Sequence, residues 1–350
     1  MSTQTIDFVV LGPGAHMAWL LNVWPHADER PLLVGVSQTY IGFLMPSLEA
    51  DSARKQTDLP FHTWADDQGP QQALNDLLKA AKVTDAKSIA LDESMRADFA
   101  ALVQAALPDA RYQFSETTTS ALRLCKDDQE YKALKHNAHI ADVAMQSAWS
   151  KMRPGLTEND VAALIRDAFK QLDASPLFHI IGAGRNGAFP HHHTGETVLQ
   201  TGDAVVMDLG CSTRGYPSDI TRMALIGEPP PGYAEVHAIV EQAVQAALNA
   251  AKPGVKAHTV DDAARQVIDD AGYGEYFMHR TGHGIGVEIH EPPYITASSQ
   301  TVLASGMVFS IEPGIYLPER FGIRLEEIVI LKDNGPEILS ALPRDARLIS

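Results

Sequence analysis

Acidic residues interrupt four otherwise apolar segments in the second half of the chain. Each segment has the pattern of a core β-strand, where an unpaired carboxylate is costly or shifts its pKa until it is neutral. If the four segments meet, their carboxylates need cations. For any single acid the alternative is a strand end in solvent, or for Asp219 an ion pair with Arg222. The acids are Asp208 in 204–209, Asp219 at the start of 220–226, Glu312 after 307–311 and Glu326 in 322–331.

Strand geometry predicts which of these acids share a site. A turn at 215–217 would fold the second segment back on the first and bring Asp208 close to Asp219. On the last segment, side chains alternate between the two faces, so Glu326 and Glu327 point in opposite directions. We therefore expect Glu326, with Arg324 on its face, to meet the other acids, and Glu327 to lie elsewhere.

The same order of patterns occurs twice in this half of the chain. Each copy has a Pro-Gly turn, a helix with threonine at its expected N-cap, and an apolar strand with an acid six residues after its first glycine. This duplication predicts two related halves around a pseudo-twofold axis, with the carboxylates at equivalent places. The matched positions are Arg153 and Lys252, 99 residues apart, Thr157 and Thr259, 102 apart, and Gly202 and Gly306, 104 apart.

Three of the 14 histidines fall in one glycine-rich segment, as His279, His283 and His290. The glycines on both sides of His283 allow a tight turn and a close backbone approach. Carboxylate oxygens combined with one imidazole suit Mn²⁺, Zn²⁺ or Co²⁺. Two such ions ~3.5–4 Å apart would activate one water and polarise one carbonyl, and with a bridging hydroxide they would leave the four carboxylates near neutral.

The first part of the chain shows mixed α/β patterns and gathers no histidines, acids and glycines at metal-ligand spacing. A polar stretch at 117–120 separates it from an amphipathic helix expected at 126–149. We therefore predict one domain over residues 1–121 and a second over 122–350. In the first, strands are expected at 31–36 and 87–91, and helices at 71–81 and 96–107.

Composition excludes several classes of protein. The net charge of −16 argues against binding to nucleic acid or to an anionic membrane surface. The two cysteines, Cys125 and Cys211, cannot form a disulfide framework, and Cys211 is interpreted as a packing residue. No apolar run approaches the roughly 20 residues of a membrane helix, and residues 1–4 begin no signal peptide. We expect a cytoplasmic protein.

Six motifs together resemble the proline-specific metallopeptidases of the pita-bread fold, Xaa-Pro dipeptidase (prolidase) and aminopeptidase P. They are V-V-M-D-L-G, S-D-I-T-R, T-G-H-G-I-G, I-H-E-P-P, S-I-E-P-G-I-Y and G-I-R-L-E-E, in family order between about Leu122 and the C-terminus. The resemblance implies an α/β protein with a creatinase-like N-terminal cap and dimerisation domain. A duplicated α+β pita-bread catalytic domain would follow, in a homodimer.

The resemblance also implies a dinuclear metal site. Asp208 would chelate one ion, Asp219 and Glu326 would bridge both, and His283 and Glu312 would hold the second. We expect two divalent ions per chain, Mn²⁺ first, with Zn²⁺ and Co²⁺ as alternatives.

Five residues have implied catalytic roles. Glu312 would shuttle the proton of the attacking hydroxide to the leaving nitrogen, and His290 would hydrogen-bond the carbonyl oxygen. His191 would lie near the scissile bond. His279 is either a nearby donor or structural, and Arg324 either orients the bridging glutamate or meets the substrate.

The activity implied most directly is hydrolysis of the Xaa-Pro bond in dipeptides, so the expected partner is a small peptide with proline in second position. Aminopeptidase P activity on longer Xaa-Pro peptides is one alternative. A metal-dependent lyase, another C–N hydrolase and a metal-free binding protein are others. The loop at 177–193 should line the specificity pocket, but it matches no family pattern position by position, so substrate preference stays open. His192 and His193 are expected in solvent.

Overall fold

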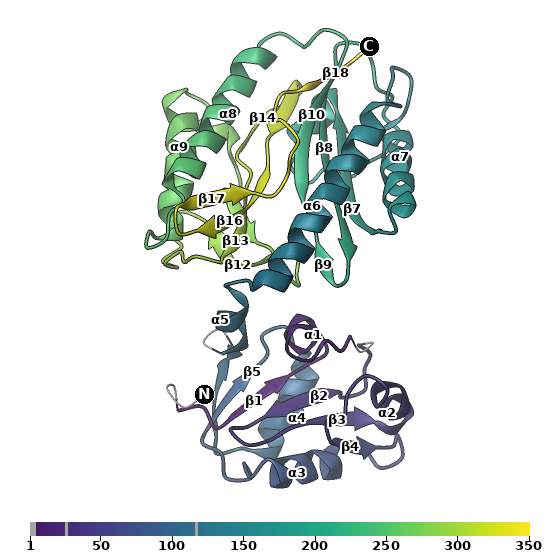
Figure 1. The fold of residues 1–350 in the computed structure, drawn as a ribbon, viewed down its shortest axis with the longest axis vertical. Helices are drawn as coiled ribbons and strands as arrows, with labels where there is room; N and C mark the ends of the chain where they lie inside the picture. The colour runs from purple at the N-terminus through teal and green to yellow at the C-terminus, as the bar shows by residue number, and fades with distance from the viewer. Residues whose placement is uncertain (1–4, 25–26, 116–117) are drawn as a thin grey trace. The chain divides into compact units, whose positions relative to one another are not determined.

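The chain divides into two compact units, Met1–Arg123 and Leu124–Ser350, in a computed structural model that describes residues 5–24, 27–115 and 118–350 (Figure 1). Residues 1–4 and Thr117, in the stretch expected to separate the domains, lie outside the described residues. The functional boundary after residue 121 therefore stays a prediction. Within the described ranges, no helix is long and apolar enough to cross a membrane.

The first unit is built on a six-stranded mixed sheet in the order β4-β3-β2-β1-β5-β6. Strands β1, β2 and β3 pair antiparallel, and the other pairs are parallel. Its elements are β1 (Phe8–Leu11), α1 (Ala15–Leu21), β2 (Leu33–Val36), β3 (Ile41–Pro46), α2 (Ser47–Ala53), β4 (Phe61–Trp64), α3 (Gln71–Ala80), β5 (Ser88–Leu91), α4 (Ala97–Ala106), β6 (Arg111–Phe114) and α5 (Thr119–Arg123).

Two apolar cores cover the two faces of this sheet. Leu77 of α3 and Phe99 of α4 pack on one face, and Met17 of α1 and Ala50 of α2 pack on the other. The two strands and two helices expected here are confirmed as β2, β5, α3 and α4. The remaining strands, α1, α2 and α5 were not predicted.

The second unit places two five-stranded sheets between two pairs of helices. Helices α6 and α7 lie on one side of this unit, and α8 and α9 lie on the other (Figure 1). The sheets run β18-β10-β8-β7, with β9 on β8, and β12-β11-β13-β16-β17, while β14 and β15 form a separate hairpin. The helices are α6 (Asp128–Trp149), α7 (Glu158–Gln171), η3 (Gly184–Ala188), α8 (Tyr233–Ala250), α9 (Ala257–Asp270) and η4 (Gly274–Tyr276).

The strands of this unit contain or directly adjoin the residues of the candidate site. They are β7 (Ser175–Ala183), β8 (Ala204–Thr213), β9 (Tyr216–Pro217), β10 (Ile220–Ile226), β11 (Gly282–Gly284), β12 (Glu291–Ile295), β13 (Val308–Ile311), β14 (Gly314–Leu317), β15 (Phe321–Arg324), β16 (Glu327–Lys332), β17 (Gly335–Ile338) and β18 (Arg347–Ile349).

The predicted duplication is confirmed in the backbone hydrogen bonds. Thr157 forms a β-bridge with Val198, and Lys256 forms the same bridge with Val302. The helix starts are therefore 99 residues apart, which makes the expected N-cap at Thr259 wrong by three residues, since Thr259 lies inside α9. Matching bonds flank both bridges: Gly155 N to Leu199 O (2.9 Å) and Gly254 N to Leu303 O (2.8 Å).

The expected continuous strand over 322–331 is wrong. The chain leaves β15, which pairs with β14, and enters β16, which pairs with β13, so Leu325 and Glu326 lie at the change of partner. The Glu326 backbone is held there by Thr221 O, which accepts its N–H (3.3 Å), and by Arg222 Nη1, which donates to its carbonyl (2.5 Å). Glu326 and Glu327 still point in opposite directions, as alternation predicted.

The two threonines provide a matched test of the repeat. Thr157 Oγ1 accepts the Asp160 N–H, and the Asp160 carboxylate accepts the Thr157 N–H, so Thr157→Ala should cost about 1 kcal/mol. Calorimetry of the metal-free protein should show the transition of the second unit lowered by about 2–4 °C. Thr259→Ala should leave it unchanged or slightly higher, because alanine has the better helix propensity. Equal losses would contradict the 99-residue alignment.

Candidate active site

The β8–β10 hairpin brings the first two acids together. Thr221 pairs with Asp208 across the hairpin, and Asp219 directly precedes β10. The reversal is made by Arg214 and Gly215, both with positive φ, and not by 215–217 as a whole. Both carboxylates are 8% exposed, so the hairpin holds two acids in an almost buried position.

The second half supplies an imidazole and two more acids. His283 lies at the centre of β11, and Glu312 directly follows β13. Ser310 Oγ joins them: it accepts the His283 N–H (2.9 Å) and donates to Glu312 Oε1 (3.0 Å). A Cβ on Gly282 would lie 1.9 Å from Ser310 O, so only glycine permits this close strand contact.

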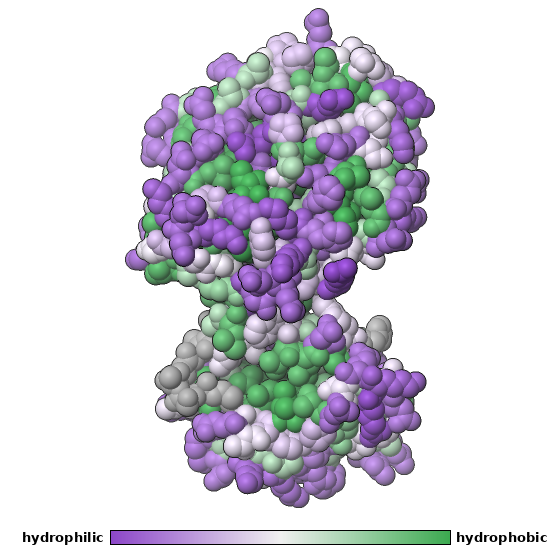
Figure 2. Space-filling view, in the orientation of Figure 1, coloured by the Kyte–Doolittle hydropathy of each residue, from purple (hydrophilic) through white to green (hydrophobic). Residues whose placement is uncertain are grey.

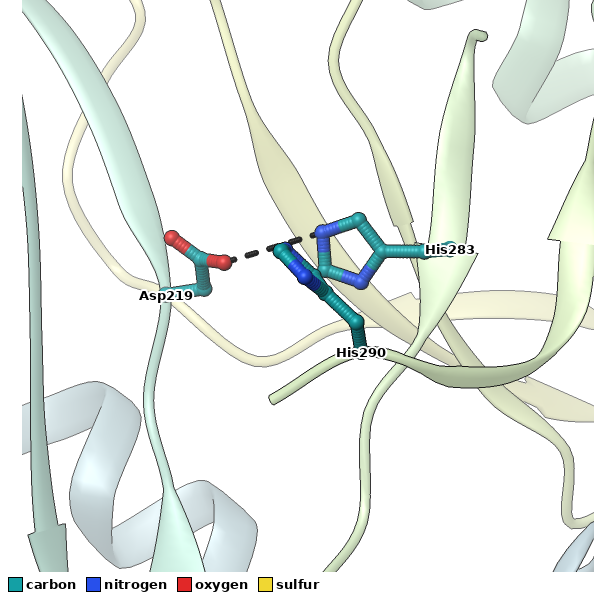
Figure 3. A group of neighbouring side chains, drawn as sticks. All are labelled: Asp219, His283 and His290. Atoms are coloured by element: carbon teal, nitrogen blue, oxygen red, sulfur yellow. Dashed lines mark ion pairs between the residues drawn. The ribbon is translucent and has the colours of Figure 1, made fainter. Parts of the chain in front are cut away.

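The ligand atoms fall into overlapping groups. Within each group the carboxylate oxygens and imidazole nitrogens lie within 4.8 Å of one another. Two of the groups share Glu326, which is the arrangement that a bridging carboxylate requires. Figure 3 shows the third, in which the His290 ring packs edge-on against His283 beside Asp219. The groups are Asp208, Asp219 and Glu326; His283, Glu312 and Glu326; and Asp219, His283 and His290.

The tautomer of His283 leaves a lone pair directed at carboxylates. Its Nδ1–H donates to Gly284 O (3.1 Å), so Nε2 carries no proton in the neutral ring. Burial, aided by His290, lowers the pKa of His283 to about 3. Nε2 nevertheless faces Glu312 Oε1 at 3.3 Å and Asp219 Oδ2 at 3.7 Å. Three electron-rich atoms at these distances fit a cation among them.

The raised pKa values of the carboxylates also indicate that this group needs cations. Burial, followed by Glu326 and Asp208, raises the pKa of Asp219 well above its usual value, and burial likewise raises that of Glu312 to about 7. Burial and the Glu312 and Asp208 charges raise the pKa of Glu326. Among the described residues, Asp208 Oδ1 and Glu326 Oε1 are buried without a hydrogen-bond partner. This oxygen-rich donor set with one neutral imidazole fits hard or borderline divalent ions.

Arg324 connects the two halves of the site. Its Nη2 donates to Asp208 Oδ2 (2.5 Å), and its Nε donates to Thr221 Oγ1 (3.0 Å), which in turn donates to Glu326 Oε2 (2.8 Å). Its Nη1 donates to Pro190 O (3.1 Å), directly before His191. One guanidinium therefore orients ligands on two strands and anchors the His191 loop.

A chain of hydrogen bonds continues from Arg324 to His279. Arg324 Nη1 donates to the Tyr316 hydroxyl (3.0 Å), which donates to His279 Nε2 (2.7 Å). His279 Nδ1 donates to Arg280 O (2.7 Å), which fixes the tautomer, and burial lowers the pKa of His279 to about 4. Neutral His279 thus supports Tyr316 and Arg324. Tyr316 and Thr221 were not predicted, although Thr221 lies two residues after Asp219 on the same strand face.

The predicted residues surround one cavity of about 830 Å³. All nine residues selected from the sequence line it, and no expected site residue lies elsewhere. An apolar wall completes it, formed by Leu177, Phe178, Ile180, Pro190 and Ile289. The first three come from the segment expected to line the specificity pocket, although they lie on strand β7 and not in a loop. The nine are His191, Asp208, Asp219, His279, His283, His290, Glu312, Arg324 and Glu326.

The histidine loop is less exposed to solvent than expected. His192 is half-buried and contacts the Glu158 carboxylate at 2.8 Å, so its expected solvent position is wrong, whereas His193 is exposed. Glu158, fully buried at the start of α7, also accepts the N–H groups of Ala183 and Gly195. The Glu158 carboxylate therefore fixes the loop that carries His191.

One group of potential ligands in the first unit was not predicted. His16, Asp92 and Glu93 place ligand atoms within 4.8 Å of one another. Arg123 Nη1, however, lies 3.1 Å from His16 Nδ1, and the Asp92 oxygens accept hydrogen bonds from Gly12 and Ser94. The acceptors are already used, so this group serves the fold of the first unit.

Comparisons with known proteins agree with this geometry. The model of metallopeptidase family M24 matches residues 132–333. The Xaa-Pro dipeptidase of Pyrococcus horikoshii is 31% identical over 347 residues, covering 99% of this chain and 95% of the relative. The prolidase structure from Thermococcus sibiricus has a TM-score of 0.91 at 30% identity, covering 99% and 95% of the two chains. The X-Pro aminopeptidase structure from Thermotoga maritima has a TM-score of 0.85 at 31% identity, covering 98% of each.

The fold match confirms the expected α/β class with a duplicated pita-bread unit. The assignment to a family rests on three findings: the carboxylates and imidazole of the site, the M24 match over most of the second unit, and the relatives that match nearly the full length of the chain. This chain belongs to metallopeptidase family M24.

Proposed function

We propose that this protein hydrolyses the Xaa-Pro bond of dipeptides. The observation that carries the proposal is the convergence of four carboxylates and the bare His283 Nε2 at the floor of a cavity with an apolar wall. A curated relative that matches nearly the whole chain is named Xaa-Pro dipeptidase. An apolar wall suits the proline ring, and proline lacks the N–H through which general peptidases bind extended substrates.

Five residues would hold two divalent ions, with Mn²⁺ as the first candidate and Zn²⁺ and Co²⁺ as alternatives. Asp208 would chelate one ion, His283 and Glu312 the other, and Asp219 and Glu326 would bridge. The membership of Glu326 in two of the three ligand groups supports its bridging role. Two ions held in this way would activate one water and polarise the scissile carbonyl.

The surrounding side chains would orient the substrate and move one proton. Glu312 accepts the proton of the attacking water and delivers it to the proline nitrogen as the C–N bond breaks. His290, exposed in the cavity, donates to the carbonyl oxygen as charge develops there. His191 borders the scissile bond from its anchored loop. Arg324 and His279 act as positioning residues through the bonds described above.

Aminopeptidase P activity on longer peptides is the second candidate. The similarity to a solved X-Pro aminopeptidase over 98% of both chains favours it. Both activities use the same cleavage chemistry and differ in what occupies the space beyond the proline.

We further propose a cytoplasmic homodimer, with residues 1–121 as the cap and dimerisation domain. Large apolar side chains of the first unit, among them Trp24, Leu48 and Phe114, are more than half exposed. Figure 2 shows an apolar area on the visible face of this unit. Such an area is typical of a surface that a partner covers.

Substrate length separates the two candidate activities. With Mn²⁺ added, Ala-Pro and Gly-Pro should be cleaved with a higher kcat/KM than Ala-Pro-Ala, as measured by release of free proline or of the N-terminal residue. Ala-Ala, which lacks the ring, should be cleaved 10-fold or more slowly than Ala-Pro, the cost of an unfilled apolar pocket. Preference for the tripeptide would instead establish aminopeptidase P activity, and cleavage of none would reject both.

Three carboxylate variants test the ligand assignment. Asp208→Asn and Glu326→Gln each remove a charge that two ions need, so both should lose metal and activity. The loss should exceed the roughly 10- to 100-fold that follows removal of a ligand's hydrogen-bond partner. The measurements are metal content per chain and Ala-Pro turnover.

Glu327→Gln is the matched control. Glu327 is as buried as Glu326 but binds Arg222 (2.9 Å) and Arg344 (3.1 Å). It should keep the metal and show a lower Tm, because two arginines lose their counter-charge. An inactive, metal-free Glu327→Gln beside an active Glu326→Gln would reverse the assignment.

Metal should change the pH dependence of stability. Without ions, the raised pKa values of Asp219, Glu312 and Glu326 mean that the native state binds more protons than the unfolded state. Their contribution is therefore present at low pH and lost as pH rises through about 7. Since ions bind the deprotonated carboxylates, Mn²⁺ should raise Tm more at pH 8 than at pH 5 in thermal melts. An equal or smaller shift at pH 8 would contradict the cluster.

A further inference from the structure

A wholly buried ion pair lies beside the site but outside its cavity lining. Lys126 Nζ contacts Glu291 Oε1 at 2.7 Å, with 0% and 2% of the two side chains exposed. Lys126 comes from the segment before α6, and 165 residues separate it from its partner in the sequence. Neither residue was selected from the sequence.

Glu291 closes the turn that carries His290. It directly follows His290, pairs with Gly284 of β11 and accepts the Glu288 N–H at 3.2 Å. Its carboxylate fills the inside of the turn so closely that a Cβ on Gly286 would lie 2.3 Å from Oε1. The position of this carboxylate therefore determines where the turn, and with it His290, can lie.

Lys126 is itself held at three points. Its Nζ also donates to Leu124 O (3.3 Å), its N–H donates to Gly306 O (2.8 Å), and the adjacent Cys125 forms a β-bridge with Met307. Gly306 and Met307 lead into β13, whose Ser310 holds the His283 backbone. Through its side chain and its backbone, Lys126 thus connects the turn of His290 to the strand that supports His283.

A buried ion pair is seldom the most stable solution at its position. Apolar residues of similar volume are often as stabilising, whereas removal of one partner leaves a buried, uncompensated charge. The main effect of this ion pair is therefore geometric and not stabilising, because its charge and hydrogen bonds define one position for the Glu291 carboxylate.

We propose that Lys126 is a positioning residue for His290: through Glu291 it holds the 286–290 turn so that the His290 ring faces the scissile carbonyl. This rests on the proposed peptidase function. His290 forms its hydrogen bond as charge develops, so a displaced ring lowers kcat and leaves substrate binding largely intact.

A double-mutant cycle tests the proposal. Lys126→Met keeps much of the side-chain volume and removes the charge. It should lower kcat on Ala-Pro by about 100-fold, the cost of a misplacement near 1 Å, with KM and metal content little changed. In a His290→Ala background the same substitution should leave kcat nearly unchanged, because its target is gone. Equal fold-losses in both backgrounds, or an unchanged kcat in Lys126→Met, would overturn the proposal.

Two further variants serve as a control and as a replacement if Lys126→Met does not fold. Lys135→Met removes an ammonium paired with Glu337 near the surface and should leave kcat unchanged. If Lys126→Met fails to fold, the variant Lys126→Met with Glu291→Gln removes both buried charges and should fold but stay slow.

A crystal structure of the variant that combines Lys126→Met with Glu291→Gln gives a readout that does not depend on activity. The proposal expects the His290 ring displaced or in several positions, while an undisturbed ring contradicts it. If the wild-type protein cleaves no Xaa-Pro peptide, the proposed function fails, and this structure still decides the positioning claim.

Discussion

The crowding of four carboxylates and a neutral imidazole in a nearly buried space is the constraint on which the rest of the molecule depends. Arg324 brings one positive charge to the group, which is too little for four acids. The unpartnered oxygens of Asp208 and Glu326 and the bare His283 nitrogen remain directed inward. Cations would satisfy all of these atoms at once, and the same ions would supply the chemistry of a metallopeptidase.

The duplicated architecture makes such crowding achievable. Each half has a strand that carries a carboxylate or directly precedes one, and outer helices bury both strands, so neither half needs more than two or three acids of its own. Arg222, fully buried, holds the halves in register: it donates to the carbonyls of Thr221 and Glu326 and to the Glu327 carboxylate. The break between β15 and β16 then turns Glu326 inward.

Local pattern was sufficient to predict most of the site. Acids inside apolar strands and a histidine between glycines are visible without a structure, and all of the residues selected on this basis line the cavity. Features that depend on which residue far away in the sequence becomes the partner were not predicted. Examples are the strand break at Glu326, the Tyr316–His279 bond and the contact of Lys126 with Glu291. The Thr259 cap was wrong because the turns before the two helices have equal lengths, so that Lys256, and not a threonine, takes the place of Thr157 in the second repeat.

The most direct test of the central claim is calorimetric titration of chelator-treated protein with Mn²⁺ at pH 6, repeated in buffers of different ionisation enthalpy. The cluster predicts two ions bound per chain, with protons released as the carboxyls that burial keeps protonated give way to metal. Binding of no ion, or of one ion without proton release, would contradict it.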